Sequence, residues 1–222
     1  MTVRDQRREA RAAAEHLIAV DPRLADVVRA GGLINPYVWP GLPLREGDLV
    51  AGLALHIVSQ QITTGVALSM FQKLTALLGG TISARALAEA TVDELRRAGL
   101  SVAKARALHE LGERVARGSL SLESLRELDD AAAQAELVAL RGIGPWSAQM
   151  FLLHELRRPD VFPAGDVGLR TALARLDGLD KAPDIKQAQQ RAQIWSPYRS
   201  YAAAYLWTWP RQAQAGTHLL HS

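Results

Sequence analysis

Apolar residues recur at separations of three and four along most of this chain, which is the period of an amphipathic helix. Runs that alternate apolar and polar residues, as half-buried strands require, are scarce. Alanine, the strongest helix former, accounts for 37 of the 222 residues. The sequence therefore predicts an all-α fold.

Capping residues set the expected helix boundaries. Ser83, Ser101 and Asp129 each precede an apolar-periodic segment, and Thr91 with Glu94 forms a capping box. The expected helices are 4–20, 22–30, 46–61, 64–78, 84–90, a short segment after Thr91, 102–117, 129–140, 145–157, 167–176, 184–194 and 198–208. No repeat or long linker separates these helices. We therefore expect a single helical unit over residues 1–222, with two lobes and the proline-rich stretch Asn35–Pro43 as its hinge.

Composition excludes several classes of protein. The chain has no cysteine, which rules out a disulfide scaffold, a thiol nucleophile and cysteine-ligated zinc or iron–sulfur sites. Polar residues break every apolar stretch before it reaches bilayer length, and the charged first twenty residues do not resemble a secretory leader. We expect a cytoplasmic protein, nucleoid-associated if bacterial. Net charge is only +3, but the basic residues gather beyond residue 140, which favours a polyanionic partner.

Two helices meet at Gly142-Ile143-Gly144, and Pro145 follows at the first turn of the second helix. Two glycines allow a tight turn while Ile143 anchors it in the core. The start of the second helix exposes backbone N–H groups that suit a phosphate oxygen. An ordinary turn between helices has the same composition, so the pattern alone leaves both interpretations open.

Asp166 follows a Pro-Ala-Gly loop at the expected start of a helix. Aspartate is a common N-cap, and that role alone explains its presence. A carboxylate at a helix N-terminus is also favoured as an anion, and an anion beneath a sugar would stabilise positive charge developing there. We interpret Asp160, six residues earlier, as a solvated turn residue.

Taken together, these motifs resemble a known family. The hairpin Leu140–Trp146 and the downstream Asp166 resemble the helix-hairpin-helix/Gly-Pro-Asp superfamily of DNA glycosylases, with the hairpin motif at about 129–157. The segments Ile57–Thr63, Gly99–Lys104 and Ser196–Tyr201 narrow the resemblance to its alkylbase branch, 3-methyladenine DNA glycosylase II. The resemblance spans roughly residues 20–209, and we expect a compact form without the N-terminal β domain of longer members.

The resemblance implies a monofunctional enzyme of base excision repair. Such an enzyme flips alkylated bases, 3-methyladenine and 7-methylguanine among them, out of duplex DNA and hydrolyses the glycosidic bond to leave an abasic site. It also implies a two-lobed helical fold with Asp166 at the base of a cleft, a monomer, and no required cofactor. Bifunctional members carry a lysine where this chain has Trp146, and an indole cannot form a Schiff base.

The resemblance also implies which residues form the site, by matching this sequence to the motifs of the family. Asp166 would be the catalytic residue, and Gln61 would fill the gap left by the flipped base. The walls of the base pocket would be Trp146, Tyr198, Gln60 and Met150. The contacts to DNA phosphates would come from Gly142, Gly144, Ser147, Ala148, Arg141, Lys104 and Arg170. Backbone carbonyls of Val138, Leu140 and Ile143 would hold a structural sodium or potassium ion.

A purely structural role remains an alternative for several of these residues. Surface ion pairing accounts for Lys104, Arg141 and Arg170 nearly as well, and a solvated turn accounts for Gln60. Six of the 12 aromatic residues lie between Trp195 and Trp209, and we interpret Trp207 and Trp209 as core or interface residues.

The base pocket departs from the family pattern at Tyr198 and Met150, which replace larger aromatic residues. Less aromatic surface predicts a roomier pocket that accepts a broader range of methylated bases. The alternatives to an alkylbase glycosylase are a catalytically silent DNA-binding module and a glycosylase for oxidised purines or mismatched adenine.

Overall fold

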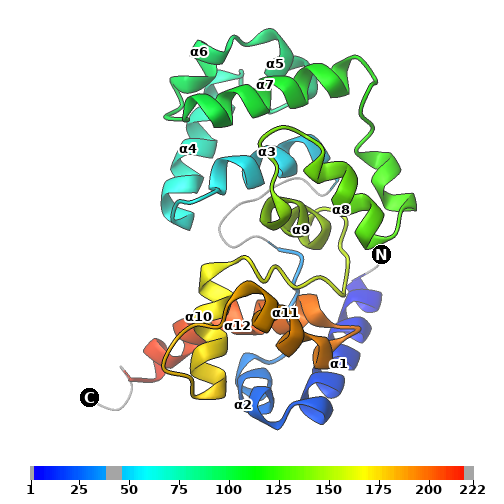
Figure 1. Ribbon diagram of the computed structural model, residues 1–222, viewed down its shortest axis with the longest axis vertical. Helices are drawn as coiled ribbons and strands as arrows, with labels where there is room; N and C mark the ends of the chain where they lie inside the picture. The colour runs from blue at the N-terminus through cyan, green and yellow to red at the C-terminus, as the bar shows by residue number, and fades with distance from the viewer. Residues whose placement is uncertain (1–2, 39–46, 218–222) are drawn as a thin grey trace. The chain divides into compact units, whose positions relative to one another are not determined.

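The computed structural model describes residues 3–38 and 47–217. Every regular element in these two ranges is helical, and Figure 1 shows short helices joined by turns. The all-α prediction is confirmed for this part of the chain. Residues 39–43 of the predicted hinge, and the predicted helix start at residue 46, lie outside the described residues.

The chain divides into two compact units. Unit 1 combines Met1–Val38 with Arg158–Ser222, and unit 2 is Trp39–Arg157. The helices of unit 1 are α1 (Val3–Val20), α2 (Pro22–Gly31), α10 (Val167–Asp177), α11 (Ile185–Ala192), the 3-10 turn η2 (Gln193–Trp195) and α12 (Arg199–Thr217). The helices of unit 2 are α3 (Leu49–Ser59), α4 (Thr64–Leu77), α5 (Ala84–Glu89), α6 (Val92–Arg96), α7 (Val102–Ala116), the 3-10 turn η1 (Glu123–Glu127), α8 (Asp130–Val138) and α9 (Pro145–His154).

Side-chain caps start the helices where the sequence predicts. The side chains of Ser83, Ser101 and Asp129 each accept a hydrogen bond from the backbone three residues on, and Thr91 with Glu94 completes its capping box. Each such bond satisfies an N–H group that the first turn of a helix leaves without a partner. The short-range signals in the sequence therefore fix the helix starts.

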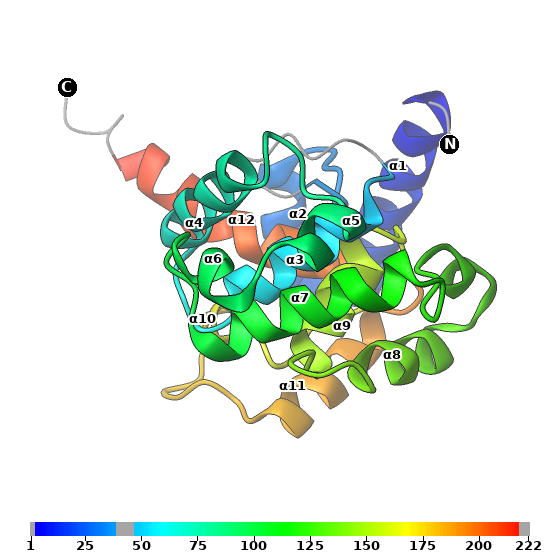
Figure 2. The same ribbon diagram turned by 90° about the horizontal axis from the view of Figure 1, so that it is seen from above.

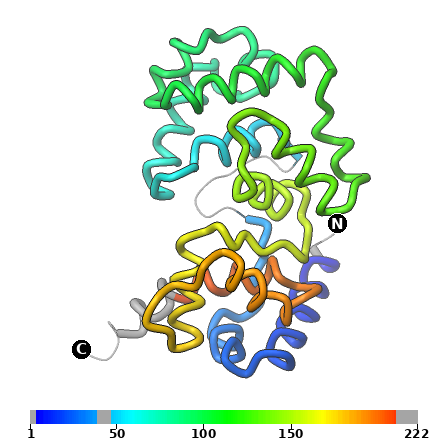
Figure 3. Tube along the Cα trace, in the orientation of Figure 1, coloured from blue at the N-terminus to red at the C-terminus, as the bar shows by residue number. Residues whose placement is uncertain are grey.

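The first two helices pack with the last helix in unit 1. Figure 3 shows the N-terminal helices α1 and α2 beside α12, and α10 packs on α12 as well. The core between them buries the aromatic rings of Tyr201, Tyr205 and Trp195. Tyr37 stands edge-on to Tyr201, with ring centroids 6.0 Å apart, and the Tyr205 hydroxyl donates to the Gly32 carbonyl at 2.7 Å. Burial raises the pKa of Tyr205 to about 12, so its hydroxyl remains a donor.

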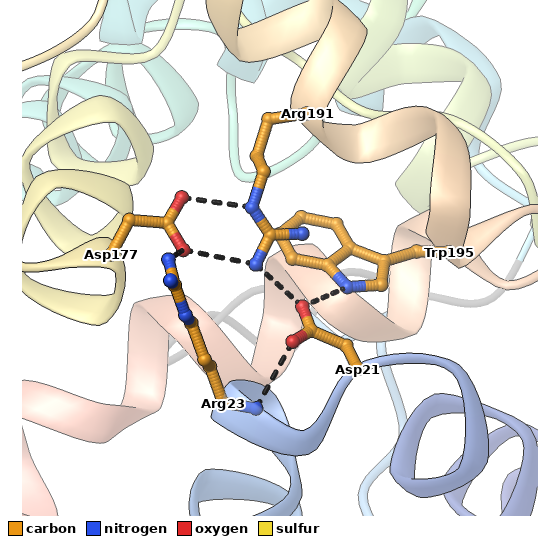
Figure 4. A network of polar contacts seen from close by, with 5 residues as sticks. All are labelled: Asp21, Arg23, Asp177, Arg191 and Trp195. Atoms are coloured by element: carbon orange, nitrogen blue, oxygen red, sulfur yellow. Dashed lines mark hydrogen bonds and ion pairs between the residues drawn. The ribbon is translucent and has the colours of Figure 1, made fainter.

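A polar network inside unit 1 ties α2 to α10, α11 and η2 (Figure 4). Asp21, the N-cap of α2, is 3% exposed, and its Oδ2 accepts from the Arg191 guanidinium at 2.6 Å and from Trp195 Nε1 at 2.8 Å. Arg191 also pairs with Asp177 through Nε at 2.8 Å, and Arg23 reaches the same carboxylate at 3.1 Å. The guanidinium of Arg191 lies over the Trp195 ring, 4.8 Å from its centroid. One buried carboxylate thus joins segments that are far apart in the sequence.

Unit 2 is built around α3, whose residues 51–59 are all buried. Beside it α5 and α7 run close together, as Figure 2 shows. A Cβ at Gly112 of α7 would lie 2.6 Å from the Ala88 backbone nitrogen and 2.6 Å from Leu87 Cβ. Only glycine permits this approach, so α7 lies against α5 backbone to backbone.

Two histidines stack inside unit 2 between α3 and α9. The rings of His56 and His154 have centroids 5.5 Å apart, and His56 Nε2 lies 3.5 Å from Glu155 Oε1. The Nδ1 atom of His154 is 3.1 Å from the Met150 carbonyl oxygen, which makes it the protonated nitrogen of a neutral ring. Burial, reinforced by His56, lowers the pKa of His154 to about 3.

This lowered pKa predicts acid sensitivity of unit 2. The unfolded chain protonates His154 near pH 6.5, whereas the folded chain resists protonation down to about pH 3. The free energy of unfolding is therefore highest above pH 6.5 and falls as the pH drops below this value. At about pH 4 the loss should amount to a few kcal/mol, because each unit of pKa difference between the folded and unfolded chain corresponds to about 1.4 kcal/mol. Urea unfolding across this range measures the slope, and His154→Leu should flatten it. An equally steep slope in that variant would assign the acid sensitivity to other groups.

Candidate active site

The hairpin between α8 and α9 depends on Gly142. This residue has a φ of +79°, and a Cβ there would lie 2.7 Å from Ala107 Cβ of α7. Ile143 is buried beside it, and its N–H donates to the Leu140 carbonyl at 3.1 Å. Gly144 then caps α9 with extended backbone, and Pro145 occupies the first turn. The hairpin therefore has the tight backbone that the sequence predicts.

Gln60, the residue that ends α3, holds this hairpin in place. Its Nε2 donates to the Gly142 carbonyl at 2.8 Å and to Ser147 Oγ at 2.9 Å. The sequence assigns Gln60 to the base pocket, but the structure uses both protons of its amide nitrogen to join α3 to α9. Gln60 is therefore a positioning residue for the hairpin.

Lys104 extends the same arrangement from α7. Its Nζ donates to the Val58 and Gln60 carbonyls, each at 2.7 Å, and so satisfies carbonyl groups at the C-terminal end of α3. Burial lowers the pKa of this ammonium group. The predicted phosphate contact does not fit this geometry, because the amine is directed at α3 backbone. The sequence could not show this, since the acceptors lie 44 and 46 residues away.

The N-terminus of α9 offers backbone N–H groups for an anion. The N–H of Ala148 donates to the Gly144 carbonyl at 3.0 Å, so this amide already takes part in the first helical hydrogen bond of α9. Ser147 is 2% exposed and its hydroxyl accepts from Gln60, which leaves its backbone as the group for a phosphate. The amides that precede the first helical hydrogen bond are where a helix binds phosphate oxygens.

A single substitution tests the hairpin geometry. Gly142→Ala would force a left-handed backbone on alanine and press its Cβ against Ala107. We expect the free energy of unfolding to fall by about 1–3 kcal/mol and duplex affinity to fall alike for damaged and undamaged DNA. The matched control is Gly144→Ala, because Gly144 has a φ of −93° and no atom near the added Cβ. Equal stability of the two variants in urea would contradict this account.

Asp166 begins α10 in unit 1. Its Oδ1 accepts a hydrogen bond from the Leu169 backbone at 2.8 Å and one from Trp207 Nε1 at 3.2 Å. Its own N–H donates to the Pro163 carbonyl at 2.8 Å, which closes the preceding loop. The helix N-terminus stabilises negative charge on this half-buried carboxylate, and the two donors fix its orientation.

The structure places Trp207 beside Asp166, a contact that sequence reasoning missed. Trp207 is interpreted above as a core or interface residue, and it does pack on the unit 1 core, but its indole also contacts Asp166. The two residues are 41 positions apart, so no local pattern predicts the contact. Trp209 on the same helix packs on the core and stacks with Arg175, 4.2 Å from the ring centroid.

The predicted pocket residues differ in exposure. Tyr198 is half-buried against the core of unit 1, with its ring edge-on to His16 at 5.5 Å and to Tyr201 at 6.0 Å. Trp146 is half-buried on the first turn of α9 in unit 2. Met150 is 4% exposed, so its side chain belongs to the core and offers almost no surface to a base.

Asp160 is not the solvated turn residue that the sequence suggests. Its carboxylate accepts from Ser196 Oγ at 2.8 Å and from Arg199 at the backbone nitrogen, Nε and NH2 at 3.2, 2.8 and 3.0 Å. Partial burial opposes ionisation, but the hydrogen bonds from Arg199 and Ser196 outweigh it and lower the pKa of Asp160. The residue anchors the start of α12.

The remaining predicted residues are mostly exposed. Gln61 and Arg141 lie on the surface of unit 2. The backbone of Gln61 has a φ of +57°, a conformation that residues other than glycine seldom adopt. Arg170 is half-buried in unit 1, where it donates to the Pro183 carbonyl at 3.3 Å. That contact holds one end of the guanidinium against the loop before α11.

The carbonyl groups predicted to bind a cation lie at the end of α8 and in the hairpin. Within residues 3–38 and 47–217, no three His, Asp or Glu side chains are grouped so that they would hold a metal ion. The predicted carbonyls belong to Val138 at the end of α8 and to Leu140 and Ile143 of the hairpin, and such oxygens suit a hard monovalent ion. The Leu140 carbonyl already accepts from Ile143 and has a second lone pair for a ligand. Separately, no helix in the described residues is both long and apolar enough to cross a membrane.

Comparison with known proteins places these features in a family. Residues 55–197 match the model of the HhH-GPD superfamily base excision DNA repair protein. This match includes the hairpin, Asp166 and all of the helices from α4 to α11. The chain belongs to the HhH-GPD superfamily.

Named relatives carry the comparison further. A DNA-3-methyladenine glycosylase of Bacillus subtilis is 29% identical over 171 residues, which are 72% of this chain and 56% of that protein. DNA-3-methyladenine glycosylase 1 of Schizosaccharomyces pombe is 27% identical over 195 residues, 86% of this chain and 84% of that one. A solved structure of a 3-methyladenine DNA glycosylase from S. pombe, in complex with abasic DNA, matches with a TM-score of 0.79 and 26% identity, and covers 89% of this chain and 95% of that chain. The matches span 42%, 56% and 34% of the lengths of three bacterial relatives, two from Bacillus subtilis and one from Mycobacterium tuberculosis.

Proposed function

We propose that this chain is a monofunctional DNA glycosylase that removes alkylated bases from duplex DNA. The observation that carries the proposal is the carboxylate of Asp166, oriented at the N-terminus of α10 by the Leu169 amide and the Trp207 indole. Membership of the HhH-GPD superfamily and likeness to DNA-3-methyladenine glycosylases support the same conclusion.

The chemistry requires one anion. Breaking the bond between C1′ and the base nitrogen leaves positive charge on the sugar, which the Asp166 carboxylate stabilises electrostatically. A purine alkylated at N3 or N7 is already cationic, so it departs as a neutral base without an added proton. Water then adds to C1′ and loses a proton to solvent or to Asp166, which leaves an abasic site.

The hairpin supplies affinity for the DNA backbone. Amide groups at the start of α9 and the glycine backbone at Gly142 and Gly144 take phosphate oxygens, without reading sequence. A sodium or potassium ion held by the carbonyls of Val138, Leu140 and Ile143 would add positive charge there. Arg141 and Arg170 remain proposed phosphate contacts, and both units thus contribute cationic groups.

The base itself leaves the helix. An enzyme acting at C1′ must flip the nucleotide out, and Gln61 at the turn after α3 is the proposed wedge. Trp146 and Tyr198 offer aromatic faces for a cationic base. Because Tyr198 replaces a larger aromatic residue of the family pattern and Met150 replaces an aromatic one, we propose that the enzyme accepts 1-methyladenine and 3-methylcytosine besides 3-methyladenine and 7-methylguanine.

A catalytically silent DNA-binding module is the competing function. Such a module needs the hairpin but not the Asp166–Trp207 contact of unit 1. A lyase activity would need an amine near the sugar, and the hairpin carries Trp146 at the position where bifunctional members have lysine.

We also propose that the protein is a monomer that acts on chromosomal DNA in the cytoplasm or nucleoid.

Released bases identify the activity directly. Methylated duplex DNA incubated with the chain should release 3-methyladenine and 7-methylguanine, detected by mass spectrometry, and should break at the abasic site only after alkali treatment. Unmethylated duplex is the control. Release of no base, with duplex binding intact, would favour the silent binding module, and strand breaks without alkali would contradict the monofunctional assignment.

A further inference from the structure

The exposed side of α1 carries four arginines on two successive turns. Arg4, Arg7, Arg8 and Arg11 are all exposed, whereas the opposite face of α1 buries Ala10, Ala13, Ala14 and Leu17 in the unit 1 core. These arginines line a hollow of about 690 Å³ together with Asp5 and Leu33, the latter 50% exposed after α2. We refer to the four arginines as the α1 cluster; Figure 1 shows α1 at the N-terminal end of the chain.

The α1 cluster does not help the helix to form. Arg4 lies three residues before Arg7 and four before Arg8. Arg11 lies four residues after Arg7 and three after Arg8. Like charges at these separations repel on a helix surface. A cation in the first turn also opposes the helix dipole, which favours anions there. Residues 4–11 hold these four arginines against two acidic residues, Asp5 and Glu9, so the net charge of this stretch is +2, and a polyanionic ligand would relieve the repulsion among the arginines.

The cluster differs from four exposed arginines elsewhere in the chain. Arg29, Arg85, Arg96 and Arg117 each pair with a carboxylate three or four residues earlier or later in the sequence. The ion pairs of the described residues include none made by the α1 cluster. They include none made by Arg97, Arg106 and Arg141 either, which are also exposed, but these three arginines do not lie together on one helix face. One carboxylate, Asp5, faces the hollow, so four guanidinium groups meet a single negative charge.

We propose that the α1 cluster binds the phosphate backbone of duplex DNA at a place separate from the hairpin. This inference rests on the proposed function, because DNA is the polyanion that the same chain is proposed to engage. Guanidinium groups suit phosphate because they offer paired N–H donors and remain charged. Exposed arginines on a solvent-facing helix lack the fixed geometry that base readout needs, so the contact contributes affinity without sequence or lesion preference.

Salt dependence measures how many phosphates the protein neutralises. Binding of undamaged duplex by the full chain should show a slope of log K against log salt that shrinks by about 0.9 for each phosphate that is no longer neutralised. We expect R4Q, R7Q, R8Q and R11Q combined to reduce the slope by about 2–4 and to weaken binding at least about tenfold at low salt. The matched control combines R29Q, R85Q, R96Q and R117Q, which removes the same net charge from paired arginines and should change the slope far less.

Two further readouts complete the test. Circular dichroism and thermal melting should show the α1 variant folded and at least as stable as the parent, since repulsion along α1 is relieved. Base release at saturating enzyme should be unchanged. If both quadruple variants reduce the slope equally, or the α1 variant leaves it unchanged, DNA binding by the cluster is overturned and an acidic protein surface becomes the better ligand. These outcomes are read from undamaged duplex, so they stand apart from any failure to detect base release.

Discussion

Asp166→Asn is expected to lower single-turnover release of 7-methylguanine by about 10² or more while leaving duplex affinity nearly unchanged. Asparagine is a good N-cap and still accepts hydrogen bonds from Leu169 and Trp207, so α10 should keep its start. The substitution removes the negative charge that stabilises the sugar as the base departs. Rates at saturating enzyme measure the bond-breaking step, and fluorescence anisotropy measures the affinity.

Asp184→Asn is the matched control for this variant. Asp184 is also an aspartate at a helix N-cap in unit 1, where it accepts from the Gln187 backbone at 2.8 Å and begins α11. We expect release by this variant to equal that of the parent. Loss of activity in both variants would point to helix capping, and full activity of Asp166→Asn would assign catalysis to another carboxylate.

Asp21→Ala should have the largest effect on stability, a loss of about 3 kcal/mol or more in the free energy of unfolding. The substitution removes the N-cap of α2, leaves the indole N–H of the fully buried Trp195 without its acceptor, and deprives Arg191 of one of its two carboxylates. Urea titration monitored by tryptophan fluorescence measures this change directly.

Asp129→Ala separates capping from the buried network. Asp129 caps α8 from an exposed position, and its side chain is bonded to the Ala132 amide at 2.8 Å. Its loss should cost about 1 kcal/mol, the usual value of an N-cap. A similar cost for Asp21→Ala would mean that the contacts to Trp195 and Arg191 add nothing to stability.

Sequence reasoning succeeds where the determining contacts are local. The caps at Ser83, Ser101 and Asp129 act over three residues, and the left-handed backbone of Gly142 belongs to a two-glycine turn. Helix starts and the hairpin could therefore be predicted without coordinates. The role of Asp166 as an N-cap is of the same kind.

It fails where a side chain is satisfied by a distant partner. From the sequence, Lys104 is expected to be a surface cation, but in the structure its ammonium group donates to carbonyls at the end of α3. Gln60 donates to the carbonyl of Gly142, which lies 82 residues later in the sequence. Asp160 finds Ser196 and Arg199 36 and 39 residues downstream. No periodicity encodes such contacts, because they depend on how helices pack after each has formed.

In the proposed reaction, the Asp166 carboxylate stabilises positive charge at the sugar. A duplex with a pyrrolidine in place of the damaged nucleotide carries that charge at the sugar position, and a tetrahydrofuran duplex has the same shape without it. The parent chain should bind the cationic duplex about 10² more tightly than the neutral one, because a transition-state mimic engages the catalytic charge. Asp166→Asn should bind the two alike; a variant that keeps the full preference for the cation would contradict the claim.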